Sequence, residues 1–277
     1  MGFLAAAVQM TSIGDVAHNL STAERLIEKA ATRGAVLISL PENFAFMGPS
    51  EREKLAMAEP LDGPIITRLR EAARRHKVTL TLGGFQERSN DPERPHNSHV
   101  VIGPDGNVVA NYRKVHLFDV ELADGSVHKE SRHTMPGTSV VTCALPAPVN
   151  ATLGLSICYD LRFPELYRKM VERGARVLLV PAAFTLHTGK DHWEVLLRAR
   201  AIENLSYVIA AAQFGKHNDK RVTWGKSMII DPWGSVIARC SDREDVCVAE
   251  IDLDYAQELG KGLPCLTHRR PDVVEKA

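Results

Sequence analysis

Apolar runs of strand length alternate with one-sided helical patterns along most of the chain. Residues 78–83 and 207–212 are continuous apolar runs, which are typical of buried strands. Residues 19–32 and 65–76 instead repeat their apolar positions at helical spacing, so that one side of each predicted helix is apolar. This alternation predicts an α/β protein in which helices cover β-sheets.

The pattern occurs twice. Residues 33–44 align without gaps on residues 173–184, and residues 101–110 align on residues 229–238. The first pair predicts a glycine-capped helix end followed by a strand, and the second predicts a hairpin with a Pro/Gly turn. We therefore expect an internal duplication with roughly a dozen strands in two sheets and helices outside. No Ser/Gly-rich linker separates the copies, so residues 1–277 are expected to form a single domain. Two further helices are expected at residues 164–172 and 192–204.

The composition excludes several classes of protein. Lys and Arg (34) balance Asp and Glu (34), so no basic surface for nucleic acid is expected. The apolar runs are too short for a membrane span, and the first residues lack the basic region of a signal peptide. The five cysteines contain no CxxC pair, which argues against a disulfide framework or a zinc site and favours a reducing cytoplasm. They are Cys143, Cys158, Cys240, Cys247 and Cys265.

Cys158 is the first candidate for chemistry. It follows a strand-like apolar run, residues 149–157, and precedes a predicted helix. A helix N-terminus offers free N–H groups and positive potential, which favour a thiolate and can hold an oxyanion. The alternative interpretation is a buried cysteine that acts as a small hydrophobic side chain.

The duplication acts as an internal control for two charged residues. Glu42 aligns with Ala182, and Lys114 aligns with Asp242, so the fold accepts other residue types at these positions. Neither charge is therefore demanded by the backbone. Glu42 is either a solvated loop charge or a base in a site, and Lys114 is either a solubilising charge on a strand edge or part of that site.

Together these three residues form a chemically coherent set. A carboxylate at Glu42 can take the proton of the Cys158 thiol and return it to a leaving amine. Lys114 can keep that carboxylate charged and can stabilise an oxyanion together with a backbone N–H, which we expect to be that of Tyr159. The set predicts attack on an amide or nitrile carbon, with no metal or organic cofactor.

Three segments resemble the motifs of the nitrilase superfamily of carbon–nitrogen hydrolases: residues 40–42 (LPE), 112–117 (YRKVHL) and 158–165 (CYDLRFPE). The similarity covers nearly the whole chain. It implies an αββα sandwich of two mixed six-stranded sheets with outer helices, which pairs into a homodimer or a larger homo-oligomer. It also implies that Glu42 is the base, Lys114 the oxyanion lysine and Cys158 the nucleophile. Glu130 matches a second glutamate that supports the lysine, although it is also readable as a plain loop charge.

Residues 82–88, 134–137, 231–240 and 268–272 are most similar to the deaminated glutathione amidase branch, whose close relatives are the omega-amidases. This resemblance implies hydrolysis of a small anionic oxo-acid amide, with deaminated glutathione giving 2-oxoglutarate and cysteinylglycine. 2-Oxoglutaramate, N-carbamoyl amino acids and aliphatic amides stay open as substrates. True nitrilases typically have Trp after the cysteine, so Tyr159 favours an amide over a nitrile.

Arg162 is the expected anchor for a substrate carboxylate, because a guanidinium binds a carboxylate at two points. Its alternative role is an ion pair with Asp160 or Glu165. The resemblance assigns Phe184 and Thr188 to the same substrate pocket, although the recurrence of Phe184 as Phe44 favours packing. The nearby histidines are weaker candidates: His116, His133, His187 and His192.

Two other classes of function remain open from the residues. A papain-like hydrolase needs a histidine in contact with Cys158, and the CGSCW-type sequence of that class is absent here. A catalytically silent interaction scaffold on the same fold is the second alternative, because a fold does not by itself fix a function.

Overall fold

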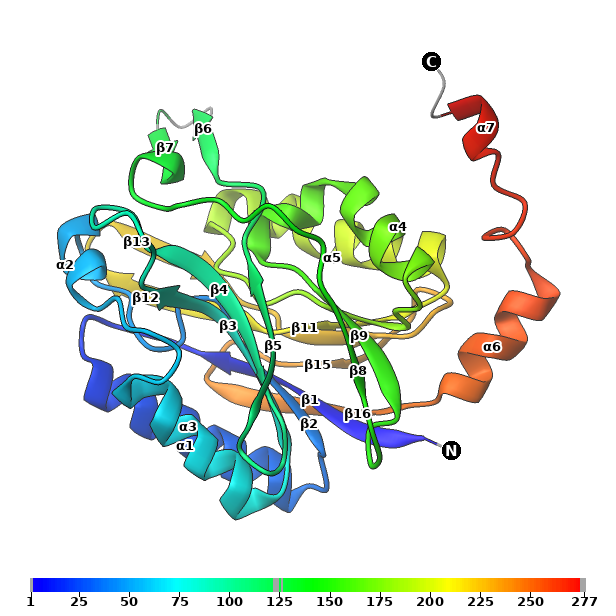
Figure 1. Ribbon diagram of the computed structural model, residues 1–277, viewed down its shortest axis with the longest axis horizontal. Helices are drawn as coiled ribbons and strands as arrows, with labels where there is room; N and C mark the ends of the chain where they lie inside the picture. The colour runs from blue at the N-terminus through cyan, green and yellow to red at the C-terminus, as the bar shows by residue number, and fades with distance from the viewer. Residues whose placement is uncertain (1, 122–124, 126, 275–277) are drawn as a thin grey trace.

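Two β-sheets pack face to face, and helices cover their outer faces (Figure 1). The computed structural model describes residues 2–121, 125 and 127–274. Helices α1 (Val16–Thr32) and α3 (Pro64–His76) lie outside the first sheet, and α4 (Pro164–Glu172) and α5 (Leu186–Asn204) lie outside the second. The arrangement confirms the expected αββα sandwich.

The first sheet has the strand order β13-β12-β1-β2-β3-β4-β5, and β16 pairs with β1. Its strands are β1 (Phe3–Met10), β2 (Leu37–Leu40), β3 (Thr79–Glu87), β4 (His96–Ile102), β5 (Val108–Arg113), β12 (Ala212–Asn218), β13 (Arg221–Trp224) and β16 (Asp245–Ile251). The second sheet has the order β15-β14-β11-β10-β9-β8. Its strands are β8 (Thr142–Leu145), β9 (Ala151–Leu155), β10 (Val177–Leu179), β11 (Tyr207–Ala210), β14 (Met228–Ile230) and β15 (Val236–Arg239).

The remaining elements are short. Strands β6 (Asp119–Glu121) and β7 (Val127–Lys129) form a separate two-stranded sheet. The other helices are α2 (Glu51–Ala56), α6 (Leu253–Gly262) and α7 (Pro271–Val274), with 3-10 turns η1 (Glu130–Arg132) and η2 (Cys158–Arg162). Within the described part of the chain, no helix is both long and apolar enough to cross a membrane.

The first sheet has more strands than we expected, eight instead of six. The run 207–212, which predicted one strand, divides at Ala211. Strand β11 ends in the second sheet, and β12 continues in the first, where Ala212 pairs with Gln9 of β1. An apolar run buried in both sheets has no polar residue to mark this crossing, so the sequence pattern conceals it.

The two copies of the repeat form equivalent elements. Helix α1 leads to β2 and helix α4 leads to β10, through Gly34 and Gly174 with φ values of +86° and +91°. These left-handed glycines end the helices as expected. The aligned hairpins are β4–β5 and β14–β15.

The core has three layers, as a four-layer sandwich requires. Leu37 and Val101 of the first sheet pack with Leu153 and Leu179 of the second, between the two sheets. Separate apolar layers fill the space under α1 and α3 and under α4 and α5. Because the helices bury one face of each sheet and the sheets bury the other, most strand residues are apolar.

Parallel pairing brings the predicted site residues to one edge. Strands β2 and β3 are parallel, and β5 has the same direction as β3 because both are antiparallel to β4. Glu42 follows the carboxyl end of β2, Lys114 follows that of β5, and Cys158 follows that of β9 in the second sheet. The carboxyl ends of parallel strands are the usual position of ligand sites in α/β proteins.

Candidate active site

Glu42 lies at a tight junction between β2 and β3. Its neighbour Asn43 has a left-handed backbone with φ of +60°, and Gly84 of β3 has φ of +67°. A Cβ atom on Gly84 would lie 2.5 Å from Glu42 Cγ, so only glycine allows this approach. Glu42 is 4% exposed, which excludes a solvated loop charge.

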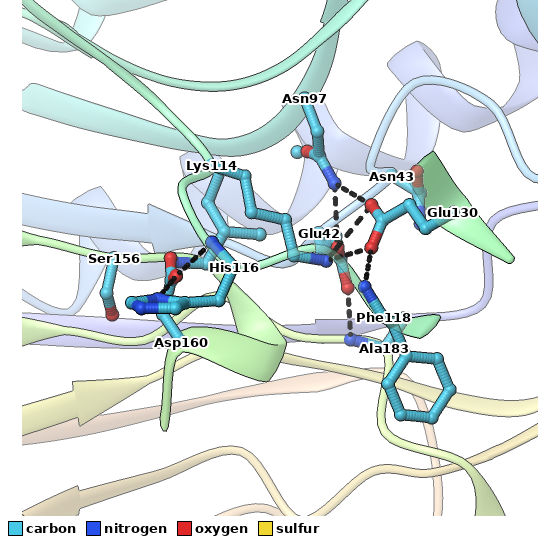
Figure 2. Close-up of polar contacts among 12 residues, drawn as sticks. Glu42, Asn43, Asn97, Lys114, His116, Phe118, Glu130, Ser156, Asp160 and Ala183 are labelled. Atoms are coloured by element: carbon cyan, nitrogen blue, oxygen red, sulfur yellow. Dashed lines mark hydrogen bonds and ion pairs between the residues drawn. The ribbon is translucent and has the colours of Figure 1, made fainter. Parts of the chain in front are cut away.

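Both carboxylate oxygens of Glu42 accept hydrogen bonds (Figure 2). Lys114 Nζ donates to Oε1 at 3.1 Å, and Asn97 Nδ2 donates to the same oxygen at 2.9 Å. The backbone N–H of Ala183 donates to Oε2 at 3.0 Å. These contacts come from β4, from the segment after β5 and from the segment after β10, so three parts of the fold fix one carboxylate.

Lys114 is paired with a second carboxylate, that of Glu130. Its ammonium donates to the two oxygens of Glu130 at 2.9 and 3.1 Å, and the N–H of Phe118 donates to Oε2 at 2.7 Å. The side chain of Lys114 is 2% exposed and that of Glu130 is 13% exposed. Neither residue is therefore an ordinary surface charge.

Burial and charge act in opposite directions on this pair. Burial alone lowers the pKa of Lys114, but the carboxylates of Glu130 and Glu42 raise it well above its usual value. Burial favours the neutral form of Glu130, but the ammonium of Lys114 lowers its pKa to about 2. Both groups are therefore charged at neutral pH.

Cys158 opens the 3-10 turn η2 with a left-handed backbone, φ of +50°. Such a conformation is unfavourable for a residue with a side chain and recurs at functional sites. The N–H of Cys158 donates to the carbonyl of Pro181 at 2.9 Å, and its thiol lies beside the Glu42 carboxylate. Cys158 is partly exposed and lines a cavity, so it is not merely a buried hydrophobic residue.

The expectation that a helix N-terminus favours the thiolate form of Cys158 is wrong. The α-helix begins only at Pro164, and Cys158 belongs to a short turn that provides little helix dipole. Burial, and then the charge of Glu42, raise the pKa of the Cys158 thiol well above its usual value, although Lys114 opposes them. The resting residue is therefore a thiol that needs a base, and Glu42 is the adjacent carboxylate.

The four expected substrate-binding residues all line one cavity of about 880 Å³ that also contains Glu42, Lys114 and Cys158. They are Tyr159, Arg162, Phe184 and Thr188. Phe184 also packs on Trp193, with ring centroids 4.9 Å apart, so the packing role expected from the repeat holds as well. Thr188 shares a hydrogen bond of 2.9 Å with Thr185, which caps α5.

Arg162 points into the cavity between two aromatic rings. Its guanidinium lies 5.9 Å from the ring centroid of Tyr159 and 5.7 Å from that of Phe184, and it contacts His192 Nδ1 at 3.3 Å. Among the described residues, no ion pair joins Arg162 to Asp160 or Glu165. Its guanidinium has no carboxylate partner in the part of the chain that the structure describes, and such a group in a cavity is suited to an anionic ligand.

Sequence reasoning missed three groups that hold the carboxylates. Asn97 bridges Glu42 and Glu130, and the N–H groups of Ala183 and Phe118 bind one carboxylate each. Backbone donors leave no signal in the residue type. Asn97 lies on β4, and no spacing along the chain relates it to either glutamate.

The histidines near the motifs make different contacts. His116 binds Asp160 and stacks on Phe163, with ring centroids 3.7 Å apart. His133 and His187 line the cavity, whereas His192 contacts Arg162. Across residues 2–121, 125 and 127–274, no group of three or more His, Cys, Asp or Glu is arranged to hold a metal ion.

Known proteins are similar to this chain in sequence and in architecture. The family model described as carbon-nitrogen hydrolase matches residues 4–261. The deaminated glutathione amidase of Bos taurus is 47% identical over 98% of this chain and 83% of its own length.

Two solved structures extend the comparison. The NitFhit protein of C. elegans has a TM-score of 0.92 and 44% identity, and the match covers 98% of this chain and 66% of that one. An amidase from Nesterenkonia sp. AN1, with a TM-score of 0.76 and 27% identity over 94% of this chain and 99% of that one, has acrylamide added at its active-site cysteine. With its motifs gathered in one cavity and a family match over nearly its whole length, this chain belongs to the carbon-nitrogen hydrolase family.

Proposed function

We propose that this protein is a cysteine-dependent amidase that hydrolyses deaminated glutathione to 2-oxoglutarate and cysteinylglycine. The observation that carries the proposal is the ion cluster of Glu42, Lys114 and Glu130, which lies beside the partly exposed Cys158 in one cavity. The 47% identity to a deaminated glutathione amidase supports the choice of substrate.

The proposed reaction begins with proton transfer. Glu42 takes the proton of the Cys158 thiol, and the thiolate attacks the amide carbon. The oxyanion is held by Lys114 and by the N–H of Tyr159. When the carbon–nitrogen bond breaks, Glu42 gives its proton to the leaving amine, and a thioester remains on Cys158. Glu42 then activates a water that cleaves the thioester, which releases the acid and restores the thiol.

The charge of the cavity supports a substrate with two carboxylates. Seven of the described lysines and arginines line it in addition to Lys114, whereas Glu51 and Asp191 are the acids besides Glu42 and Glu130. Arg162 comes from η2, and Lys54 comes from α2, where its side chain is 17% exposed and its ammonium lies 3.8 Å from Glu51. Deaminated glutathione carries a carboxylate on each side of the scissile amide, whereas 2-oxoglutaramate carries one.

A substrate panel tests this choice. Deaminated glutathione, the same compound with its glycine carboxylate amidated, 2-oxoglutaramate, an N-carbamoyl amino acid and an aliphatic amide are compared by kcat/KM, with 2-oxoglutarate and ammonia followed separately. We expect deaminated glutathione to be hydrolysed fastest and its amidated form more slowly. Equal rates on all five compounds contradict the proposed substrate and leave the family assignment intact.

Two substitutions test the catalytic assignment. Cys158→Ala removes the nucleophile and Glu42→Gln removes the base, so we expect both to lose hydrolysis while circular dichroism and melting temperature stay close to the wild type. Full activity in either variant contradicts the mechanism. A papain-like mechanism predicts instead that one histidine variant is as damaging as Cys158→Ala, and an inactive scaffold predicts no turnover by the wild type.

We also propose that the protein works as a homodimer in the cytoplasm. Three large apolar side chains on α5 and on the β14–β15 turn support pairing because they are about half exposed or more: Val195, Ile202 and Trp233. The free cysteines support a reducing compartment.

A further inference from the structure

We propose that Asp160 is a positioning residue that holds the Cys158 turn against the segment carrying Lys114. The inference rests on the proposed function, because it concerns how the nucleophile and the oxyanion lysine are kept in register. Asp160 belongs to the CYDLRFPE segment, and its partners belong to the YRKVHL segment, so it gives a physical role to motif residues that the reaction itself does not use.

The carboxylate of Asp160 is fully buried and accepts four hydrogen bonds. Oδ2 accepts from the hydroxyl of Tyr112 at 2.7 Å and from the N–H of Ile157 at 2.8 Å. Oδ1 accepts from Nδ1 of His116 at 2.7 Å and from the N–H of His116 at 3.1 Å (Figure 2).

These four bonds join the two sides of the site. Ile157 directly precedes Cys158 after β9 of the second sheet, whereas Tyr112 and His116 stand two residues before and two residues after Lys114 at the end of β5 in the first sheet. The hydroxyl oxygen of Tyr112 also accepts a hydrogen bond from the N–H of Val115 at 3.1 Å, and this bond fixes the turn that follows Lys114. One carboxylate therefore connects the nucleophile turn to both flanks of the lysine.

Burial fixes the donors of these four hydrogen bonds and makes the bonds costly to break. Burial, and then the charge of Asp160, raise the pKa of Tyr112 far above that of a free phenol, so its hydroxyl keeps its proton and donates. Charge-assisted hydrogen bonds are stronger than neutral ones, and a buried donor left without its acceptor is costly. The geometry is therefore stiff against separation of the two segments.

His116 combines two contacts that can be separated by mutation. Its ring stacks on Phe163 at an interplanar angle of 8°, and its Nδ1 binds Asp160. His116→Phe keeps a stacking ring and removes the donor. His116→Asn removes the ring and keeps a side-chain nitrogen at the position of Nδ1.

The first measurement is steady-state kinetics of these two variants. A small displacement of a reacting group lowers the rate of chemistry without removing the binding groups, and we expect roughly a tenfold to hundredfold loss of kcat in His116→Phe with KM nearly unchanged. His116→Asn is expected to recover most of this loss, because the bond to Asp160 is restored.

The second measurement needs no substrate. Lys114 lowers the pKa of Cys158, so a displaced lysine should move the pH midpoint of Cys158 alkylation by iodoacetamide upward. We expect this upward shift in His116→Phe and in Tyr112→Phe, and a midpoint near the wild-type value in His116→Asn. Peptide mass spectrometry distinguishes Cys158 from the other cysteines, and Tyr112→Phe serves if His116→Phe does not fold.

The outcomes separate this inference from the proposed function. Equal losses of kcat in His116→Phe and His116→Asn, or unshifted alkylation midpoints in both phenylalanine variants, overturn the positioning role of Asp160. Failure of the wild type to hydrolyse deaminated glutathione overturns the proposed substrate instead and leaves the alkylation test valid.

Discussion

Cys158 has two charged neighbours that act oppositely on its thiol. The carboxylate of Glu42 raises the pKa of the thiol, in addition to burial, and the ammonium of Lys114 lowers it. Because Glu130 neutralises much of the lysine charge, the local balance favours a protonated cysteine at rest. A site of this kind is protected from unproductive reactions of a free thiolate and activates the cysteine only when Glu42 accepts its proton.

The first prediction at this scale concerns Glu42→Gln. Removing the negative charge should lower the pKa of Cys158, so alkylation by iodoacetamide should occur at lower pH than in the wild type even though hydrolysis is lost. The measurement is the pH dependence of the alkylation rate of Cys158. A midpoint that stays in place or moves upward contradicts the electrostatic role of Glu42.

Glu130 provides a second prediction, on stability. Its pKa falls from 4.5 to about 2 in the folded protein, so its ionised form stabilises the fold by roughly 3 kcal/mol above pH 4.5. That contribution is lost as the pH falls from about 4.5 toward 2. We expect Glu130→Gln to unfold at lower urea concentration than the wild type at pH 7, with the difference narrowing between pH 5 and 3. A difference that does not depend on pH points to lost packing instead.

At the scale of elements, strand β3 determines where Glu42 lies. Gly83 and Gly84 interrupt the pairing of β3 with β4, where the register shifts between Leu82 and Phe85. A Cβ atom on Gly83 would lie 2.0 Å from Pro181, and one on Gly84 would meet Glu42. This irregularity lets the ends of β2 and β10 approach β3 closely.

We therefore expect Gly84→Ala to lower kcat by more than its loss of stability can explain. The added methyl group is strained by the positive φ and also displaces Glu42. Gly174→Ala is the matched control, because it has φ of +91° and no atom within 4 Å of an added Cβ. We expect Gly174→Ala to lose about 1 kcal/mol of stability in urea unfolding, and Gly84→Ala to lose more because its Cβ would also meet backbone atoms of Asn43 and Glu42. kcat should fall only in Gly84→Ala, and equal activity of the two variants contradicts this interpretation.

Two predicted helices show which local signals set the ends of a helix. Helix α4 has the expected bounds, Pro164–Glu172, because proline opens it and Gly174 ends it. Helix α5 begins at Leu186, six residues before the expected position 192. Its N-cap, Thr185, is a capping residue that the sequence analysis did not use, and its first turn lines the cavity.

At the scale of the whole molecule, the exposed apolar residues of α5 adjoin the β14–β15 turn. Arg198 Nε donates to the carbonyl of Gly234 at 2.7 Å, which holds Trp233 near this helix. Trp233 is 58% exposed and Val195 is 66% exposed. Exposed large side chains gathered in this way are typical of an interface.

If the protein is a dimer through this surface, Trp233→Glu should weaken it. We expect light scattering after size-exclusion chromatography to give a mass nearer the 30.5 kDa monomer. Val109→Glu, at a 47% exposed position on β5, is the control and should keep the wild-type mass. A monomeric wild type, or an unchanged mass in Trp233→Glu, contradicts the proposed interface.

By itself, the sequence determined the duplicated α/β architecture, and it identified Glu42, Lys114 and Cys158 as the candidate catalytic residues. Periodicity reports which side of an element is apolar, and comparison of the two copies indicated that the backbone accepts other residue types at the positions of Glu42 and Lys114. The single-domain organisation and the individual catalytic roles stay predictions.

Only the tertiary structure decided the protonation state of Cys158 and which groups hold the catalytic side chains in place. The high pKa of the Cys158 thiol depends on burial and on a carboxylate 116 positions away in the chain. Asn97, the N–H groups of Ala183 and Phe118, and the carboxylate of Asp160 act through contacts between distant segments. Electrostatic and hydrogen-bond energies depend on distance in space, and no local pattern of residues encodes that distance.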